Sequence, residues 1–404
     1  MPEAVIVAIA RSPIGRARVG SLCQMRPDDL LADMISAALA KVPELDPTSV
    51  DDVMVGCGGT AGEQGFNIAR VAAVLAGLDS VPGTTVNRYC SSSLQTTRMA
   101  FHAIKAGEGD VFISAGVESL SRPGFAVADD SQYANPRFEA AAARAAQVAQ
   151  GTTGWSDPRE DGALPDVYIA MGQTAENVAR YRGITRAEQD EFGVRSQNLA
   201  EQAVAAGFWA TDITPVTLPD GSIVDRDDSP RPGVTIDAVS ALQPVFRPNG
   251  TVTAGNCCPL NDGAAAIVIM SDITAKDLGL TPLARIISTG VSGLSPEIMG
   301  LGPVAASNQA LARAGVSIDD IDLVEINEAF AAQVIPSARD LGVPMEKLNV
   351  CGGAIAVGHP FGMTGARITS TLINALRWHD KQYGLETMCV GGGQGMAMVV
   401  ERLS

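Results

Sequence analysis

Short, nearly continuous apolar runs alternate along much of the chain with segments whose apolar residues recur at helical spacing. In the first part of the chain, the predicted strands are residues 4–10, 53–57, 84–87 and 110–115, and the predicted helices are 28–40, 67–76 and 91–106. Strands that are apolar throughout are typical of sheets buried on both faces. This β–α–β order therefore predicts a mostly parallel sheet with helices on both sides.

The stretch from residue 118 to 250 has a different character. It is rich in Ala, Asp, Pro and Arg, and its strongest periodic segments are helical, at 138–150, 171–181 and 186–206. Segments such as Asp-Arg-Asp-Asp-Ser-Pro-Arg-Pro-Gly are typical of surface loops. We therefore predict an inserted loop or lid domain that folds over the sheet. Strand character returns at residues 264–270.

The last third of the chain repeats the order of strand, small-residue turn and helix. Its predicted strands are 284–288, 322–326, 386–390 and 397–401, and its predicted helices are 305–314 and 366–378. In a loose alignment, residues 53–60 correspond to 323–330, and Cys90 with its helix corresponds to 352–359 with the following helix. A duplicated α/β unit places its turns near one interface, where we expect an active site.

The predicted fold class is therefore α/β, with duplicated βαβαβ-type halves packed together and an inserted loop domain. The predicted N-terminal domain comprises residues 1–119 and 251–271. The insertion comprises 120–250, and the C-terminal domain comprises 272–404. A length of 404 residues is sufficient for this organisation.

Composition narrows the possible partners and the location. The formal net charge of −16 argues against non-specific nucleic-acid binding and against docking on anionic membranes. It does not exclude an anionic cofactor, because a pair of arginines is enough to bind phosphates. The seven cysteines contain no C-x-x-C pair, and the N-terminal apolar run is too short for a membrane span. We therefore expect a cytoplasmic protein.

Three residues are the main candidates for chemistry. Cys90, His359 and Cys389 each lie in a segment that runs from an apolar strand through small residues to a helix or tight turn. A helix start lowers the pKa of a thiol, so a Cys and a His brought together would form an activated thiolate. The second Cys could carry a proton. A zinc site is disfavoured because only one histidine is a candidate and no cysteine pair has ligand spacing.

The other candidates have simpler interpretations. Small buried thiols usually fill apolar space, which is the expected role of Cys23, Cys57 and Cys351. His102 and His379 are expected at the surface or in packing. The glycine run at 391–395 lacks the Lys-Ser/Thr that follows a phosphate-binding loop.

These three motifs, together with Ile-Asn-Glu-Ala-Phe-Ala at 326–331, resemble those of the thiolases, the acetyl-CoA acyltransferases. The similarity also includes 171–196 and 250–266 and spans nearly the whole chain. It implies a five-layer α/β/α/β/α fold. It also implies cleavage of 3-ketoacyl-CoA by CoA through a cysteine acyl-enzyme, giving acetyl-CoA and a shortened acyl-CoA. CoA would be a co-substrate, with no permanently bound cofactor and no metal.

The resemblance also implies a role for each matching residue. Cys90 matches the nucleophile, and His359 matches the group that holds it as a thiolate and helps bind the thioester oxygen. Cys389 matches the acid/base. Asn327 matches the residue that fixes a water, which forms one oxyanion hole with His359. The N–H groups of Cys90 and Gly391 match the second hole.

The expected CoA contacts are Arg231, Cys258 and Met171. The family has Ser in the Thr-Ala-Gly-Asn-x-Ser-Gly stretch, whereas this chain has Cys258 followed by Pro. Ala170 replaces the His that often precedes Met171 in relatives. Arg231 falls where relatives have a CoA-phosphate arginine, although a solvated arginine in an acidic loop would give the same pattern.

The segment around Cys90, Asn-Arg-Tyr-Cys-Ser-Ser, is similar to degradative thiolases and favours a role of the fatty-acid β-oxidation type. The alternative within the family is an acetoacetyl-CoA thiolase (acetyl-CoA acetyltransferase) working in the condensation direction. Outside this activity, a decarboxylating ketoacyl synthase and a non-catalytic acyl-CoA-binding relative remain open. The resemblance further implies a homotetramer, a dimer of dimers.

Overall fold

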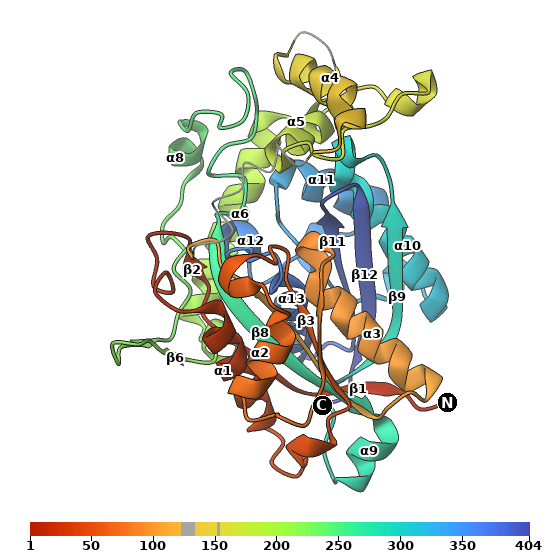
Figure 1. The fold of residues 1–404 in the computed structure, drawn as a ribbon. Coiled ribbons are helices and arrows are strands. Elements are labelled where there is room, and N and C mark those ends of the chain that lie inside the picture. Colours follow the sequence, from red (N-terminus) through yellow and green to blue (C-terminus); the bar gives the residue numbers. More distant parts are fainter. Residues whose placement is uncertain (123–133, 152–153) are drawn as a thin grey trace.

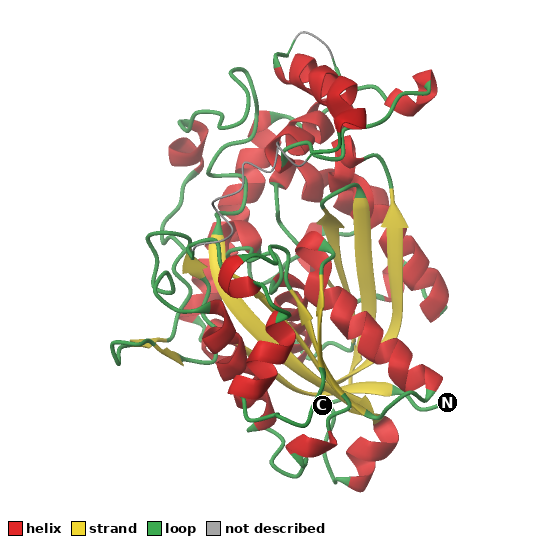
Figure 2. Ribbon diagram, viewed as in Figure 1, coloured by secondary structure: helices red, strands yellow, loops and turns green. Residues whose placement is uncertain are grey.

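Two sets of strands with the same order are joined edge to edge in the computed structural model, which describes residues 1–122, 134–151 and 154–404 (Figures 1 and 2). In these residues they form one ten-stranded sheet. The N-terminal set runs β4 (Gly83–Val86), β3 (Asp52–Gly56), β5 (Val111–Glu118), β8 (Asn261–Ser271), β1 (Ala4–Arg11). The C-terminal set runs β10 (Leu323–Ile326), β11 (Tyr383–Val390), β12 (Gln394–Arg402), β9 (Ala284–Gly293). A two-residue strand, β2 (Gly15–Arg16), pairs with β8.

The pairing directions show the duplication. β3 is parallel to β4 and β5, and the equivalent β10 is parallel to β11 and forms a parallel bridge from Val324 to Leu348. β8 is antiparallel to β5 and β1, as β12 is to β11 and β9. The two sets meet where β1 pairs with β9 over two residues, Val5–Arg285 and Ile6–Ala284. The predicted duplicated α/β fold is therefore confirmed.

The prediction of a mostly parallel sheet is wrong. Six of the nine pairings along the main path and its β2 branch are antiparallel. β11 and β12, for example, are separated by three glycines only, Gly391–Gly393. A parallel connection needs a dozen or more residues, so this turn forces a hairpin. β8, which follows the long excursion, also returns antiparallel to both of its neighbours.

Helices form three layers around the strands. α1 (Pro27–Leu39) and α2 (Ile68–Leu75) cover the outer face of the N-terminal strands, and α10 (Gly302–Ala314) and α11 (Ala331–Leu341) cover that of the C-terminal strands. α3 (Ser92–Ala106) and α13 (Thr364–Trp378) pack together in the middle (Figure 1). A separate apolar cluster fills each outer layer and a third fills the centre, which confirms the five-layer arrangement.

Side chains of the central strands alternate between these clusters. In β1, Val5 and Val7 contact the outer cluster of the N-terminal half, whereas Ile6 and Ile9 contact the central cluster. All eight residues of β1 and all eleven of β8 are buried. Burial of both faces explains why the sequence of these strands is apolar throughout.

The excursion between β5 and β8 packs mainly on the C-terminal half, and it also contacts β1, where Arg11 pairs with Asp212 and Asp227. It contains α4 (Glu139–Ala149), α5 (Met171–Arg182), α6 (Arg186–Ala205), α7 (Phe208–Asp212), β6 (Val216–Thr217), β7 (Ile223–Val224) and α8 (Ile236–Ser240). α5 and α6 contact α11, and α6 also contacts α12 (Ala354–Val357). The three helices predicted here are confirmed within about one residue at each end. The predicted domain boundaries remain a prediction.

Other elements differ from the sequence-based expectations. α11 was not predicted, because its residues are apolar or small on nearly every side and Pro336 lies inside it. A short helix, α9 (Asp272–Asp277), follows β8. In the described part of the chain, no helix has both the length and the apolar content needed to cross a bilayer.

The contact between α3 and α13 depends on Gly365. A Cβ added there would lie 2.7 Å from Leu94 Cβ, closer than packed carbons allow. Gly365→Ala should therefore lower the free energy of unfolding by about 1–3 kcal/mol, measured by urea denaturation. Gly293→Ala is the control, because its Cβ would meet only one atom at 3.9 Å. Equal stability of the two variants would contradict this account of the helix contact.

Candidate active site

Cys90 lies in a single 3₁₀ turn, Tyr89–Ser91, immediately before α3. The preceding Tyr89 has a positive φ of 45°, a strained conformation for a residue with a side chain. Its N–H donates to Asn87 Oδ1 at 2.8 Å, and its carbonyl accepts from Ser92 Oγ at 2.6 Å. These bonds hold the strained turn and fix the direction of the buried Cys90 side chain.

The Cys389 thiol faces Cys90 from the other half of the molecule. Cys389 is the penultimate residue of β11, and the end of this strand contacts the Tyr89–Ser91 turn. The N–H of Gly391, two residues further on, donates to the Cys90 thiol. Burial raises the pKa of Cys389 well above its ordinary value, and a charge on Cys90 would raise it further. The two thiols are therefore close enough to interact electrostatically.

Two hydrogen bonds hold His359 in the loop before α13. Its backbone N–H donates to Asn261 Oδ1 at 2.9 Å, and its Nδ1 lies 2.6 Å from Thr364 Oγ1. The Thr364 hydroxyl gives its own proton to the Pro360 carbonyl, so it accepts one from Nδ1. This assigns the proton of the neutral ring to Nδ1 and leaves Nε2 as a base.

Asn327 connects His359 to the end of β10. Its Nδ2 lies 3.3 Å from His359 Nε2, and its backbone N–H donates to Thr387 in β11. The Asn327 carbonyl accepts from Gln333 Nε2 at 2.6 Å. Its side-chain oxygen is buried and has no hydrogen-bond partner among the described residues. That oxygen is therefore available to a group outside the protein.

Two buried carboxylates that sequence reasoning did not select hold the surrounding loops. Glu118, at the end of β5, accepts from the N–H groups of Gly58, Gly59 and Gly362, at 2.8, 2.9 and 2.8 Å. Since Gly362 follows His359 by three residues, Glu118 ties the His359 loop to the N-terminal half. Burial raises the pKa of Glu118, and these donors oppose that shift.

Glu328 holds loops together by hydrogen bonds on the C-terminal side. It accepts from Ser196 Oγ in α6, from Asn349 Nδ2 and from the Ile355 N–H, at 2.6, 2.8 and 3.1 Å. The available signal for both residues was an acidic residue at the end of an apolar strand or within two residues of it. Such a residue is costly to bury unless donors surround it.

The three residues expected to contact CoA lie in different places in the structure. Cys258 lies beside the active site, because charges on Cys90 and Cys389 both act on its thiol. Its N–H donates to the carbonyl of Ala329, in the Asn327 loop. Met171 begins α5 and packs on the outer cluster of the C-terminal half. Arg231 is exposed, and its N–H donates to Gln197 Oε1.

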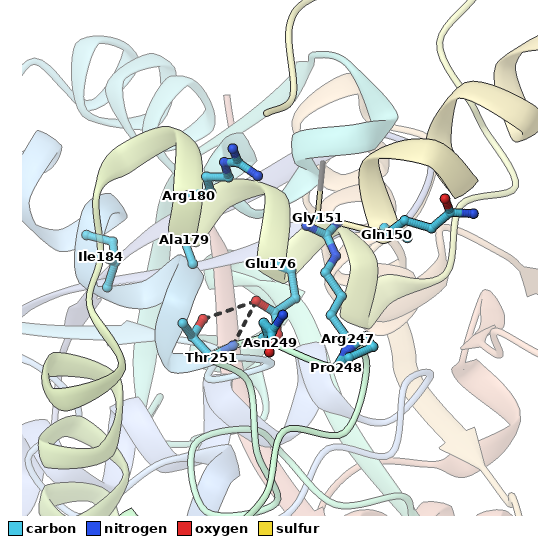
Figure 3. A pocket seen from close by; sticks show the side chains of 12 residues that line it. Gln150, Gly151, Glu176, Ala179, Arg180, Ile184, Arg247, Pro248, Asn249 and Thr251 are labelled. Carbon is cyan, nitrogen blue, oxygen red and sulfur yellow. Dashed lines mark hydrogen bonds between the residues drawn. The ribbon is translucent and has the colours of Figure 1, made fainter. Parts of the chain in front are cut away.

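A pocket of about 330 Å³ opens elsewhere, between the end of α4, one side of α5 and residues 247–251 (Figure 3). Arg180 and Arg247 line it, and the Glu176 carboxylate accepts from Thr251. None of the predicted site residues is among the described residues that line it. We therefore locate the candidate site at the two thiols and not at this pocket. Within the described residues, no cluster of His, Cys, Asp and Glu has an arrangement suited to a metal ion.

Comparison with known proteins identifies the family of this chain. The family model for the thiolase N-terminal domain matches residues 4–273, and that for the thiolase C-terminal domain matches residues 280–402. The chain belongs to the thiolase family. These matches cover both halves of the duplicated fold.

Individual thiolases are similar over their full length. A 3-ketoacyl-CoA thiolase from Alcanivorax borkumensis is 44% identical over 99% of this chain and 98% of its own. A 3-oxoadipyl-CoA/3-oxo-5,6-dehydrosuberyl-CoA thiolase from Escherichia coli is 43% identical over 100% of both chains. The crystal structure of an acetyl-CoA acetyltransferase from Bacillus anthracis has a TM-score of 0.88 at 37% identity, and the match covers 100% of this chain and 99% of the other.

The expected low thiol pKa is not found in this thiolase. Burial raises the pKa of Cys90 to about 12, the Gly391 N–H opposes the shift, and the Glu118 carboxylate adds to it. Burial, with a smaller effect of Arg367, lowers the pKa of His359 to about 3. Both shifts favour the uncharged thiol and imidazole. The helix start before α3 does not outweigh this desolvation.

These shifts predict the pH dependence of Cys90 alkylation. Only the thiolate reacts, so with a pKa near 12 the rate with iodoacetamide should rise about tenfold per pH unit between pH 7 and pH 10. Mass spectrometry of the modified peptide identifies the site of alkylation. A rate that levels off near pH 7–8 would instead show a thiolate–imidazolium pair in the free protein.

Proposed function

We propose that the protein catalyses thiolytic cleavage of 3-ketoacyl-CoA by CoA, giving acetyl-CoA and an acyl-CoA shortened by two carbons. The observation that carries this proposal is that two buried thiols, Cys90 and Cys389, lie close together and that the Gly391 N–H donates to Cys90. The buried pair of His359 and Asn327 supports it as the proposed base and water-binding group. A thiolate is nucleophilic enough at neutral pH to attack a ketone without a metal. CoA acts as a co-substrate.

In the first half-reaction, Cys90 attacks the C3 carbonyl as its proton moves to Nε2 of His359. The bond between C2 and C3 then breaks, and its electron pair leaves with acetyl-CoA as an enolate. Cys389 gives its proton to C2 of that enolate. The products are an acyl group on Cys90, an imidazolium, a Cys389 thiolate and free acetyl-CoA.

In the second half-reaction, the thiol of a new CoA gives its proton to the Cys389 thiolate and attacks the acyl-enzyme. Cys90 leaves and takes back its proton from His359. All protons and charges are then restored. Because burial favours the neutral Cys90–His359 pair, we propose that proton transfer accompanies the attack and does not precede it.

Two sets of fixed donors stabilise the developing negative charge. The backbone N–H groups of Cys90 and Gly391 face the C3 oxygen. Nε2–H of the imidazolium and a water bound by Asn327 face the thioester oxygen. Removing one such donor typically costs roughly 3–4 kcal/mol of transition-state stabilisation. The free Asn327 side-chain oxygen is consistent with a bound water.

The degradative role, the CoA contacts, the oligomeric state and the location are also proposals. The relatives that carry 3-ketoacyl-CoA and 3-oxoadipyl-CoA in their names support 3-ketoacyl-CoA cleavage of a degradative type. Condensation of acetyl-CoA is the second candidate, favoured by the likeness to an acetyl-CoA acetyltransferase. Cys258, Met171 and Arg231 would contact CoA. We also propose that the protein is a homotetramer and that it is cytoplasmic. The seven free thiols are compatible with a reducing compartment.

The proposed reaction is tested by following the CoA-dependent loss of 3-ketoacyl-CoA through the ultraviolet absorbance of its enolate, with straight, branched and carboxylate-ended acyl groups.

 Wild-type protein should turn over at least one of these substrates, and Cys90→Ala should show no turnover because the acyl-enzyme cannot form. Cys23→Ala, which changes a partly exposed thiol, is the control and should retain the wild-type rate. If the wild type binds CoA but cleaves none of these substrates, the binding-protein alternative replaces this proposal.

The separate role of Cys389 has its own test. Cys389→Ala should lower kcat for thiolysis by about 10²–10⁴-fold, the usual contribution of a general acid or base. The same variant should lose less of the exchange of labelled CoA with an unlabelled acyl-CoA, because that exchange moves only the proton of a thiol and needs no proton transfer to carbon. Loss of both reactions to the same extent would contradict the assignment of Cys389 as the acid that protonates C2.

A further inference from the structure

A hydrogen-bond chain made by two side chains outside the predicted catalytic set joins the nucleophile segment to the glycine turn after β11. Arg88 Nη1 donates to Gln394 Oε1 at 2.7 Å, and Gln394 Nε2 donates to the Gly391 carbonyl at 3.1 Å. Arg88 precedes Cys90 by two residues, and Gly391 follows Cys389 by two. The chain therefore links the two halves of the molecule beside both thiols.

The Arg88 end of this chain is anchored to the same elements as Cys90. Arg88 Nε donates to Gln95 Oε1 in α3 at 3.0 Å, and its backbone N–H donates to Ser92 Oγ at 2.9 Å. The planar guanidinium holds two acceptors in a fixed geometry. Arg88 therefore keeps a constant position relative to the turn that carries Cys90.

The Gly391 end needs such an anchor. The turn consists of three glycines, and Gly392 and Gly393 have φ values of 74° and 80°. Glycines allow many backbone conformations, so the turn does not hold its own shape. The Tyr89 ring packs against Gly391, with Cγ 3.2 Å from the position that a Cβ would occupy. The Gln394 amide holds the carbonyl of the residue whose N–H donates to Cys90.

We infer that Arg88 and Gln394 are positioning residues that hold the Gly391 N–H against Cys90 and, during the reaction, against the C3 oxygen. A donor stabilises a developing anion best when it is already in place. The statement about the C3 oxygen rests on the proposed function, whereas the statement about the Cys90 thiol does not.

The chemistry of the Gln394 side chain suggests a selective variant. Its oxygen must face Arg88 and its NH₂ must face the Gly391 carbonyl, and a side-chain amide supplies both. In Gln394→Glu, the carboxylate still accepts from Arg88 but presents an acceptor to the Gly391 carbonyl. Gln394→Met loses both bonds. Gln382→Glu is the matched control, because Gln382 Nε2 also donates to an acceptor, Glu401 Oε1, beyond the opposite end of β11.

Each variant is assayed for iodoacetamide alkylation of Cys90 at fixed pH and for kcat and KM of thiolysis. Gln394→Glu and Gln394→Met should each slow alkylation by about tenfold, since a hydrogen bond to a charged group is weakened. They should lower kcat at least as much and leave KM for CoA within about twofold, since the donor acts mainly in the transition state. Gln382→Glu should match the wild type in every measurement.

Alkylation and turnover of Gln394→Glu at wild-type levels would overturn the inference, because the bond to the Gly391 carbonyl would then have no effect. If neither Gln394 variant unfolds cooperatively, Arg88→Met removes the anchor from the other side, and wild-type alkylation in that variant has the same meaning. Arg88→Lys, which can still donate to Gln394, should recover part of the rate lost in Arg88→Met. Absence of thiolysis in the wild type would refute the proposed function, and the alkylation rates would still decide this inference.

Discussion

The packing of α3 against α13 is the constraint on which the candidate site depends. Neither half carries the whole set of groups, because Cys90 comes before α3 while His359 and Cys389 belong to the C-terminal half. The Ser93 hydroxyl accepts from the Ala366 N–H at 2.9 Å and fixes the register of the two helices. Gly365 allows their backbones to approach closely. A shift of one helix along the other would separate the thiol from its partners.

The same packing excludes water, and this has two opposite consequences. It favours neutral forms of the thiols and the imidazole, so the resting site carries little charge. It also strengthens every fixed donor that faces a charge formed during the reaction. The buried Glu118 and Glu328 are surrounded by N–H and O–H donors. They therefore stabilise the loops around them and do not act as acids or bases. An uncharged resting site with fixed dipoles suits chemistry in which anions exist only briefly.

Much of the fold could be predicted because burial of both sheet faces leaves a strong signal. Strands such as β1 and β8 are apolar throughout, and the helices between them have regular spacing. The short glycine turn does predict that β11 and β12 are antiparallel. The direction of β8 could not be predicted, because it depends on which strands become its neighbours after the long excursion between β5 and β8. α11 was hidden by its Pro and by burial on almost all sides. Periodicity fails for such a helix, since it has no polar face.

Within the site, the positions of the reactive residues could be predicted from motifs, but their ionisation could not. The sequence places Cys90 at a helix start, which favours the thiolate, and does not show how fully the opposite half covers it. Desolvation then reverses the expected direction of its pKa.

The positioning residues escaped prediction for a related reason. Glu118, Arg88 and Gln394 bind groups from segments that lie far away in the sequence, and two of these three bind backbone atoms. No spacing rule describes such partners, because a backbone N–H or carbonyl exists at nearly every residue. What the sequence does show is a polar side chain beside buried strands and turns, which is expensive to bury without a partner. In an enzyme whose reactive groups come from two halves, such residues are the first candidates for holding the halves in register.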